Sequence, residues 1–439
     1  MSNVVIGLLC MAGFLALMFL AVPVPFSMLI PSVLALAVMK TPRAAIQMLS
    51  GDFIANFSNY TLTVGPLFAL MGFLASYSGL GAKLFSTLNA FFGHRKGGLA
   101  SATVVACTLF GAICGSVPAT ISTMSAVAYP EMRRNGYSTQ LAGACIAASP
   151  TIAVLIPPSA NFIIYGMATN TSISRLFLGG IGPGLLLTAA YILAVRYIAW
   201  RHPEWAPAAR KSTWKQRWAA VRDGGLIETL LVFLLAMGGM TAGFFTTTEA
   251  SAVGAVGMLA ILLVRKKMDW KKFWRAAEAG ARLMAMVFTL LASAAVFGRM
   301  FTVSTIPARL GAFVASLSIP GWAVVGVIIL IYVVLGMFAN LLSIMLVTLP
   351  VFYPIVCTQL GYSDVWFGIV LTILIGIGGI TPPVGNGVFM THGCVSWDPD
   401  SSVKNIFGGV WPFVAASLIC AVLLIFVPQI CTFLPELLM

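Results

Sequence analysis

The feature that most constrains this chain is a pair of matched breaks in its apolar segments. In the first half, a glycine break at Gly115 is followed by the double proline Pro157-Pro158. In the second half, Gly336 is followed by Pro382-Pro383, so that the prolines are offset by 225 residues and the glycines by 221. Glycine lets the backbone leave helical geometry, while proline removes a hydrogen-bond donor and clashes with the preceding turn. The sequence therefore predicts one glycine break and one broken helix in each half of the chain.

Broken helices in so apolar a chain indicate a binding site and not a lipid-facing surface. In hydrocarbon every freed backbone group needs a partner, so irregular backbone is tolerated only inside protein or beside a cavity. Matched breaks in two halves are typical of transporters built from inverted repeats, whose substrate and ion site lies between the repeats. The pattern predicts a secondary transporter.

Composition favours a membrane protein. Only 8% of the residues are charged, against about a quarter in soluble domains. Residues 135–174 and 310–363 contain no Lys, Arg, Asp or Glu, and either run exceeds the roughly 20 residues that one spanning helix needs. The first apolar segment, residues 4–20, lacks a basic n-region and predicts a retained helix, not a signal peptide.

The net charge of +13 is concentrated in two segments. Residues 196–222 carry seven Lys or Arg and one acid, and residues 265–275 carry six and one, so together they supply +6 and +5, or +11. This asymmetry is the positive-inside signal of cytoplasmic loops, with a polybasic lipid-binding patch as the alternative. It does not indicate a nucleic-acid partner.

Signatures of other classes are absent from the sequence. The eight cysteines form no C-x-x-C pair and no Cys/His pair at metal-ligand spacing. There is no H-E-x-x-H or Walker motif. We therefore expect no enzyme activity, no disulfide framework and no transition-metal centre.

Two long uncharged segments predict re-entrant hairpins. Residues 97–130 would form a straight helix of about 51 Å, against a hydrocarbon core of roughly 30 Å, and basic residues flank both ends. A hairpin over 97–132 that turns at Gly115-Ser116 explains this, and 323–356 has the same design with a turn near Gly336 or Asn340. One long tilted helix is the alternative.

These segments give an all-α polytopic fold of two inverted repeats. We expect the first repeat over 1–205, a cytoplasmic basic interfacial linker over 206–224 and the second repeat over 225–439. The broken helices occupy 141–168 and 365–390. If the basic loops lie in the cytoplasm, the first hairpin opens toward the cytoplasm and the second toward the periplasm. Both termini then lie on the periplasmic side.

Short motifs along nearly the whole chain resemble the large membrane (M) subunit of tripartite ATP-independent periplasmic (TRAP) transporters, DctM-like, in the ion-transporter superfamily. Their order and spacing carry the resemblance. The motifs are Gly97-Gly98-Leu99-Ala100, Gly115-Ser116, Pro130-Glu131-Met132, Ile156-Pro157-Pro158-Ser159, Gly182-Pro183-Gly184, Thr248-Glu249-Ala250, Gly336-Met337-Phe338 and Thr381-Pro382-Pro383-Val384-Gly385. This chain departs from the family at Thr120 and Asn340, where relatives often carry acids, and at Gly387, where many carry Asn.

The residues around the breaks suit a dehydrated Na⁺, which needs several oxygen ligands. Unwound backbone supplies carbonyls, and Ser, Thr and Asn add neutral oxygens. In the alternative, these hydroxyls cap helix ends or bond to the preceding turn. Ser149 and Thr151 also lie near the first double proline. The predicted ion-binding residues are Gly115, Ser116, Thr120, Pro157, Ser159, Asn161, Gly336, Asn340, Thr381, Pro382, Gly385 and Asn386.

An anionic substrate would be met by half-helix N-termini, whose free amides and positive dipole suit carboxylates. The predicted substrate-binding residues are Ser116, Ser159, Asn340, Asn386 and Arg299. For Arg299 the alternative is snorkelling of its guanidinium to the outer headgroups.

The resemblance implies Na⁺-coupled import of a small organic anion, either a carboxylate or a sialic-acid-like molecule, across the bacterial inner membrane. It implies a periplasmic binding protein (P) that delivers the substrate, a small four-helix membrane subunit (Q) and no organic cofactor. It also implies an elevator mechanism, in which the hairpins and broken helices move against a scaffold. A stand-alone Na⁺ or H⁺ dicarboxylate symporter of the same superfamily is the alternative, and a channel is a remote one.

The predicted topology is testable by cysteine labelling. Because the basic loops face the cytoplasm in this arrangement, Ser212→Cys and Ser401→Cys should react only with reagents that reach the cytoplasm, and Asn3→Cys should label from outside. Labelling of Ser212→Cys from outside would overturn the arrangement.

Overall fold

The computed structural model describes residues 2–209, 211–316, 319–338 and 341–439, and throughout these ranges the regular secondary structure is helical. Six helices in the described ranges are long and apolar enough to cross a membrane, judged by length and composition, and one bent pair would make a seventh. The fold is therefore an all-α, multi-pass membrane protein, as the sequence predicted. The six are Tyr60–Tyr77, Ile173–Arg201, Thr247–Val264, Trp270–Ser304, Leu341–Gln359 and Val403–Phe426, and the bent pair joins Trp214–Asp223 to Leu226–Thr241.

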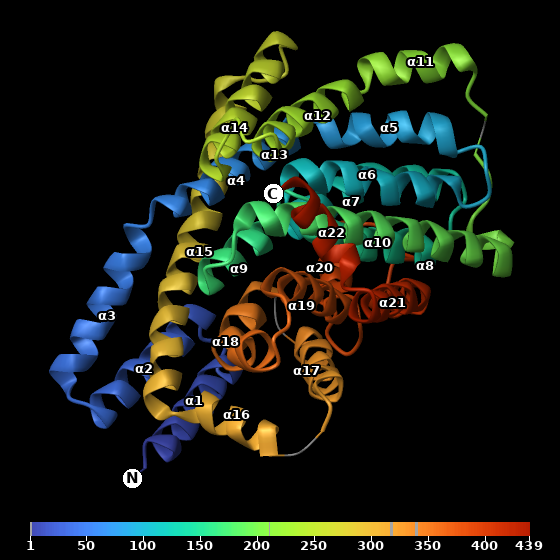
Figure 1. Cartoon of the computed structure of the whole chain (residues 1–439). Helices are drawn as coiled ribbons and strands as arrows, with labels where there is room; N and C mark the ends of the chain where they lie inside the picture. Colours follow the sequence, from blue (N-terminus) through green and yellow to red (C-terminus); the bar gives the residue numbers. More distant parts are fainter. Residues whose placement is uncertain (1, 210, 317–318, 339–340) are drawn as a thin grey trace.

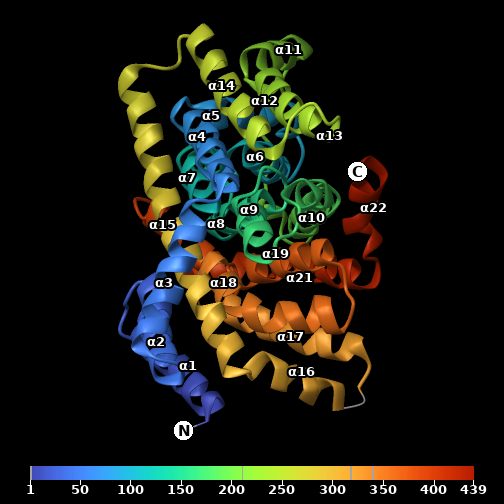
Figure 2. The same cartoon turned by 60° about the vertical axis from the view of Figure 1, so that its left-hand side comes forward.

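One group of helices, named the outer layer, is organised along the 35-residue helix α15. Helix α15 packs against α1, α2, α3 and α4, and α14 packs against α4. Figures 1 and 2 show these helices together on one side of the molecule. The outer layer consists of α1 (Asn3–Phe19), α2 (Val24–Met39), α3 (Pro42–Phe57), α4 (Val64–Tyr77), α12 (Leu226–Phe233), α13 (Gly239–Thr241), α14 (Thr247–Val264) and α15 (Trp270–Ser304).

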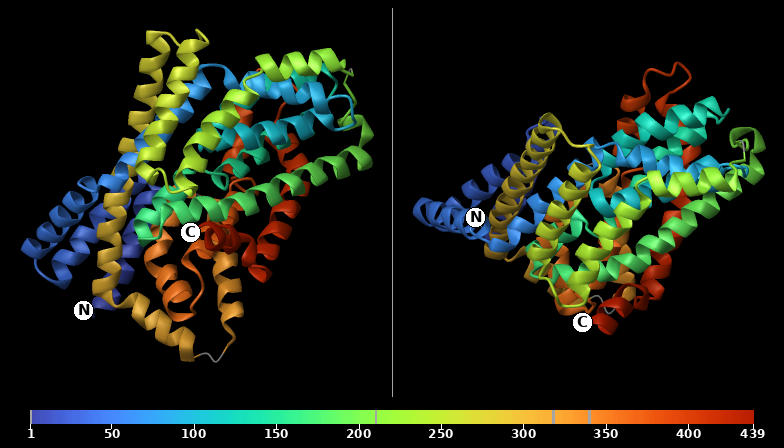
Figure 3. Two further views of the ribbon diagram at one scale, coloured as in Figure 1. Left: turned by 45° about the horizontal axis from the view of Figure 1, so that its top comes forward. Right: turned by 90° about the horizontal axis from the view of Figure 1, so that it is seen from above.

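The remaining long helices form a second group, named the site body. Helices from the two halves of the chain interleave in it, because α21 packs against α8 and α10, and α20 packs against α7. Figure 3 shows the two groups from two further directions. The site body consists of α6 (Gly98–Cys114), α7 (Val117–Arg134), α8 (Thr139–Ala148), the 3₁₀ turn η2 (Ser149–Val154), α9 (Ala160–Thr169), α10 (Ile173–Arg201), α17 (Gly321–Gly336), α18 (Leu341–Tyr353), α19 (Asp364–Gly378), α20 (Asn386–Val395), α21 (Val403–Phe426) and α22 (Gln429–Leu438).

Both uncharged segments are broken in the middle. Helix α6 ends at Cys114 and α7 begins at Val117, and these two helices pack against each other. Likewise α17 ends at Gly336 and α18 begins at Leu341. The alternative of one long helix through either segment is therefore wrong. A short helix precedes each pair, α5 (Leu80–Phe92) before the first and α16 (Ile306–Ser316) before the second.

The basic linker contains a helix, α11 (Trp214–Asp223), that lies along α5. The Thr87 hydroxyl donates to the carbonyl of Ala220 at 2.8 Å, and Lys83 Nζ donates to the carbonyl of Asp223 at 3.0 Å. The indole rings of Trp214 and Trp218 are largely exposed, as aromatic residues at the headgroup level are.

An ion pair joins the C-terminal end of α7 to the loop that follows α20. Arg133, in the last turn of α7, lies with Nε 2.7 Å from a carboxylate oxygen of Asp398, in the loop after α20, and the Tyr129 hydroxyl donates to the same oxygen at 2.9 Å. Partial burial opposes ionisation of Asp398, but these hydrogen bonds outweigh it and lower the pKa of the carboxyl below its usual value. The loop after α20 is thus fixed to the first hairpin.

Asp398→Asn should lower the free energy of unfolding by about 2 kcal/mol, because it removes a charge-assisted hydrogen bond from a carboxyl that is 7% exposed. The pKa is lower in the folded state, so this stabilisation is present above the unfolded value, near 3.9, and is lost as the pH falls through the lowered pKa. Thermal unfolding in detergent measures both effects. Asp400→Asn is the control: Asp400 also pairs with Arg133, but its side chain is 74% exposed, so a change within about 0.5 kcal/mol is expected. Equal losses in the two variants would contradict the assigned role of Asp398.

Candidate functional site

The tip of the first hairpin is pressed against the first broken helix. Gly115 has a φ of +57°, and a Cβ placed on it would lie 2.5 Å from the carbonyl oxygen of Pro158. Only glycine meets both conditions, a left-handed backbone and a contact with another backbone. The glycine break and the double proline of the first half therefore form one local structure.

The two broken helices unwind at the predicted double prolines. In the first, η2 ends at Val154 and α9 begins at Ala160. In the second, α19 ends at Gly378 and α20 begins at Asn386. The Pro157-Pro158 and Pro382-Pro383 peptide bonds are both cis. Each break leaves helix ends facing one another inside the site body.

The second hairpin approaches the second break at a glycine pair. A Cβ on Gly378 would lie 2.4 Å from the Cα of Gly336, so α17 and α19 meet with no side chain between them. The close packing of α17 against α19 therefore explains why position 336 is a glycine. Asn340, predicted for both ion and substrate binding, lies outside the described residues.

Both hairpins and both breaks border one cavity of about 250 Å³. Four predicted site residues line it: Gly115, Ser116, Asn161 and Asn386. The rest of the wall is mainly apolar, and the outer layer contributes Leu283 and Met286 from α15. The lining residues are Gly115, Ser116, Val117, Pro118, Ala147, Thr151, Val154, Ala160, Asn161, Leu283, Met286, Leu341, Leu342, Ile375, Gly376, Gly379, Ile380, Asn386, Gly387 and Met390.

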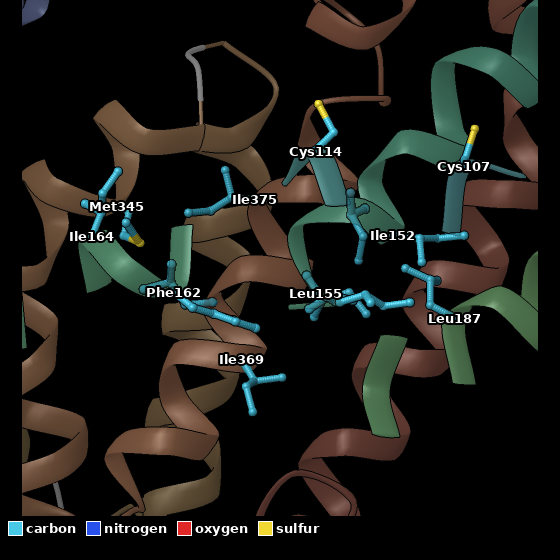
Figure 4. Packing of buried hydrophobic residues seen from close by; sticks show 14 of the residues in the cluster. Cys107, Cys114, Ile152, Leu155, Phe162, Ile164, Leu187, Met345, Ile369 and Ile375 are labelled. Atoms are coloured by element: carbon cyan, nitrogen blue, oxygen red, sulfur yellow. The ribbon is translucent and has the colours of Figure 1, made fainter. Parts of the chain in front are cut away.

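Hydrophobic packing holds the first break in place behind this cavity. Figure 4 shows Ile152 of η2 and Leu155 of the break within a cluster of buried side chains that includes Cys107 of α6 and Leu187 of α10. All four side chains are buried. The unwound segment is therefore a fixed element and not a loose loop.

The helix starts at the cavity are not capped by their own side chains. Ser116 before α7, Ser159 before α9 and Gly385 before α20 accept no hydrogen bond from the first turn. By contrast, α8, α10, α19 and α21 each begin with a serine whose hydroxyl accepts such a bond. Uncapped N-termini present N–H donors and a positive dipole end. In α20 the Gly387 and Val388 N–H groups already donate to the carbonyls of Gly379 and Gly385, at 2.9 and 2.8 Å, so the free donors are those of α7 and α9. None of the described lining residues is charged, so these dipoles favour an anion without a basic side chain.

Asn161 adds an unused donor to the cavity wall. The residue is 5% exposed, and its Nδ2 has no hydrogen-bond partner among the described residues. A buried amide without a partner costs about 1–3 kcal/mol. A ligand oxygen in the cavity would remove that cost.

The other predicted hydroxyls do not line the cavity and bond to the backbone. Thr120 donates to the Ser116 carbonyl at 2.8 Å, Ser159 to that of Val154 at 2.6 Å, and Thr381 to that of Ile377 at 2.6 Å. Each hydroxyl uses its proton in this bond and keeps its oxygen lone pairs. Pro157, Pro382 and Gly385 likewise shape the breaks without lining the cavity.

Arg299 is not brought to the cavity. Its guanidinium pairs with both carboxylate oxygens of Asp52, in α3, which is buried. Thirteen residues separate it from Met286, about 20 Å along α15. In this structure it joins two helices of the outer layer.

The sequence interpretation missed the contribution of α15. Leu283 and Met286 are ordinary apolar residues of a spanning helix, and no local signal distinguishes them. Only the packing of the outer layer against the site body places them at the cavity.

Comparison with known proteins agrees with this architecture. The family described as "Tripartite ATP-independent periplasmic transporter, DctM component" matches residues 11–430. The C4-dicarboxylate TRAP transporter large permease protein DctM of Pseudomonas aeruginosa is 30% identical over 414 residues, with 92% of each chain covered. The ectoine TRAP transporter large permease protein TeaC of Halomonas elongata is 31% identical over 432 residues, covering 97% of this chain and 98% of its own.

A solved structure supports the fold alone. The YdaH transporter of Alcanivorax borkumensis matches with a TM-score of 0.54 and 16% identity, covering 89% of each chain. Together with the match to the family over nearly the whole length, these relatives identify the chain, which belongs to the DctM family of TRAP transporter large permeases.

Proposed function

We propose that this chain imports a small organic acid across the bacterial inner membrane in symport with Na⁺. It receives the acid from a periplasmic binding protein and works beside a small four-helix membrane subunit. The observation that carries the proposal is the convergence of both hairpins and both broken helices on one cavity bounded by α15. The tripartite description of the family supports the two partners.

The ligand chemistry supports Na⁺ as the coupling ion, which the protein would carry as a second substrate. The breaks supply backbone carbonyls and the neutral oxygens of Ser116, Asn161 and Asn386, and none of the described lining residues adds a carboxylate. Na⁺ is a hard cation that neutral oxygens satisfy, and helix C-termini at the breaks add partial negative charge.

The uncapped helix starts support an organic acid as the other substrate. A carboxylate would accept from the N–H groups at the starts of α7 and α9 and from Asn161 Nδ2. The named substrates of the two relatives, C4-dicarboxylate and ectoine, are small acids of this kind. A sialic-acid-like substrate remains a proposal with no support from these relatives.

The composition of the cavity wall supports an elevator movement. The site body supplies all the polar residues of the described lining, whereas the outer layer supplies only Leu283 and Met286 to it. At the cavity, a body that carries the whole polar site can move against an apolar surface without breaking hydrogen bonds. Elsewhere the movement would exchange the hydroxyl contacts of Ser76 with Thr123 and of Ser174 with Thr247. A stand-alone symporter remains the second candidate, and uptake without the binding protein and small subunit distinguishes it.

Asn161→Ala or Asn386→Ala should raise the Na⁺ concentration for half-maximal uptake about tenfold, because each removes a polar group from the cavity. The measurement is uptake of a panel of labelled organic acids into proteoliposomes that contain the small subunit and the binding protein. The control is Asn405→Ala, whose amide donates to the Asp400 carbonyl at the distal end of the site body. An unchanged Na⁺ response in both cavity variants would make these residues structural.

A reducible crosslink between the two groups of helices tests the elevator. In a background without native cysteines, a thiol reagent with a reducible disulfide spacer joins a Ser116→Cys/Leu283→Cys pair, and so the first hairpin tip to α15, since both residues line the same cavity. Crosslinking should stop transport, and reductant should restore it. As a control within the outer layer, native Cys10 restored together with Ser32→Cys joins α1 to α2, where Cys10 Sγ lies 4.0 Å from Ser32 Oγ, and should leave transport intact. Full transport with the first crosslink complete would rule out the elevator.

A further inference from the structure

Three buried hydroxyls connect the cavity wall to α10 in the first half of the chain and α21 in the second. Thr151 of η2 lines the cavity, and its Oγ1 lies 3.0 Å from the hydroxyl of Tyr191 in α10. The Tyr191 hydroxyl lies 2.8 Å from Oγ of Ser417 in α21. Thr151 is 8% exposed, and Tyr191 and Ser417 are at most 1% exposed. Neither the Na⁺ ligands nor the carboxylate donors proposed for the cavity include these contacts.

This relay of hydroxyls lies where the two halves of the chain meet. Adding the proline offset of 225 residues to Thr151 gives Gly376, and adding it to Tyr191 gives a position next to Ser417. A Cβ on Gly376 would lie 3.7 Å from the Cβ of Thr151. Thr151 and Gly376 are thus equivalent residues of the two broken helices, in contact with each other beside the cavity.

The difference between Thr151 and Gly376 makes the two broken helices chemically unequal. Thr151 places a hydroxyl oxygen at the first break, whereas Gly376 places no side chain at the second. Thr151 donates its proton to the Ala148 carbonyl at 2.7 Å, away from the cavity, so a lone pair of Oγ1 remains for a cation. The Tyr191 hydroxyl donates its one proton to the same oxygen and restricts its position, and Ser417 completes the relay by donating to Tyr191 in place of the Phe413 carbonyl.

We propose that Thr151 is a ligand of the coupling ion at the first break, and that Tyr191 and Ser417 are positioning residues that hold its oxygen there. The second break lacks this ligand because its equivalent residue is Gly376. With one Na⁺ at each break, as the matched breaks of the sequence predict, the two Na⁺ sites differ in affinity, and the relay controls only the first. This inference rests on the proposed Na⁺ coupling.

Tyr191→Phe isolates the positioning role. It removes one oxygen and keeps the ring, which packs edge-on against Phe413 with the centroids 5.2 Å apart. Thr151 and Ser417 each keep a helix carbonyl as partner, Ala148 and Phe413 respectively. Both remaining hydroxyls of the relay stay hydrogen-bonded, so the variant should fold.

The experiment measures binding of radioactive Na⁺ to the purified protein in detergent, with choline chloride holding the ionic strength constant. Melting temperature as a function of NaCl is a second readout, because a ligand that binds only the folded state stabilises it. Neither readout needs the organic substrate. In Tyr191→Phe the dissociation constant of one class of Na⁺ site should rise about two- to tenfold, and that of the other class should stay unchanged.

Tyr332→Phe is the matched control. Tyr332 is also fully buried and accepts a hydrogen bond from Thr348 at 2.7 Å, but it does not line the cavity. Its Na⁺ binding should equal that of the wild type. Ser417→Ala should reproduce the Tyr191→Phe effect, and the double variant should add little to it, because both substitutions break the same relay.

The outcomes separate the two proposals. If the wild type binds Na⁺ and Tyr191→Phe binds it identically, the relay has no positioning role, while Na⁺ coupling stands. If Tyr332→Phe weakens binding as much as Tyr191→Phe does, the effect is general and the relay is again rejected. A wild type that binds no Na⁺ would overturn Na⁺ coupling and this inference together.

Discussion

The rest of this structure depends on one constraint. Backbone N–H and C=O groups that are freed where a helix breaks need hydrogen-bond partners, and an apolar environment offers none. Unwinding at two double prolines frees carbonyl and amide groups that lipid cannot satisfy. The structure encloses both breaks in the site body, between the hairpin tips and the last helices of each half. The cost of the breaks is offset by hydrogen bonds from Ser159 and Thr381 and by the close backbone contact at Gly115.

The same constraint explains why the site is polar yet uncharged. A charged side chain at this depth would need its own partner and would cost several kcal/mol if left alone. Helix ends provide partial charge without that cost, because their dipoles are fixed by the fold. The contrast between serine-capped helices elsewhere in the site body and uncapped helices at the cavity shows where these donors are kept free.

The two groups of helices use charge differently. In the outer layer Arg299 is paired with Asp52, and in the site body Arg133 is paired with Asp398 at the end remote from the cavity. Both pairs connect helices within one group. At the cavity the outer layer offers only apolar side chains of α15, which can separate from the site body without loss of hydrogen bonds. Elsewhere two hydroxyl contacts, Ser76 with Thr123 and Ser174 with Thr247, connect the two groups.

Residue type and order were sufficient to predict the membrane class and the helix breaks of both halves. The glycine and proline breaks predicted the helix ends at Cys114, Gly336 and Gly378 closely, because these residues act on the backbone wherever they occur. Helix α3 was not predicted, since polar residues such as Asp52 interrupt its apolar character. The short helix α22 was also missed, because polar residues such as Glu436 make it resemble a surface tail.

Which residues share a cavity was settled only by tertiary packing. Packing placed Asn161 and Asn386 at the wall, and it brought Thr151 against Gly376 across the two halves. It also paired Arg299 with Asp52, far from the cavity. These arrangements depend on contacts between segments about two hundred residues apart, which packing fixes and a local pattern of residues does not record.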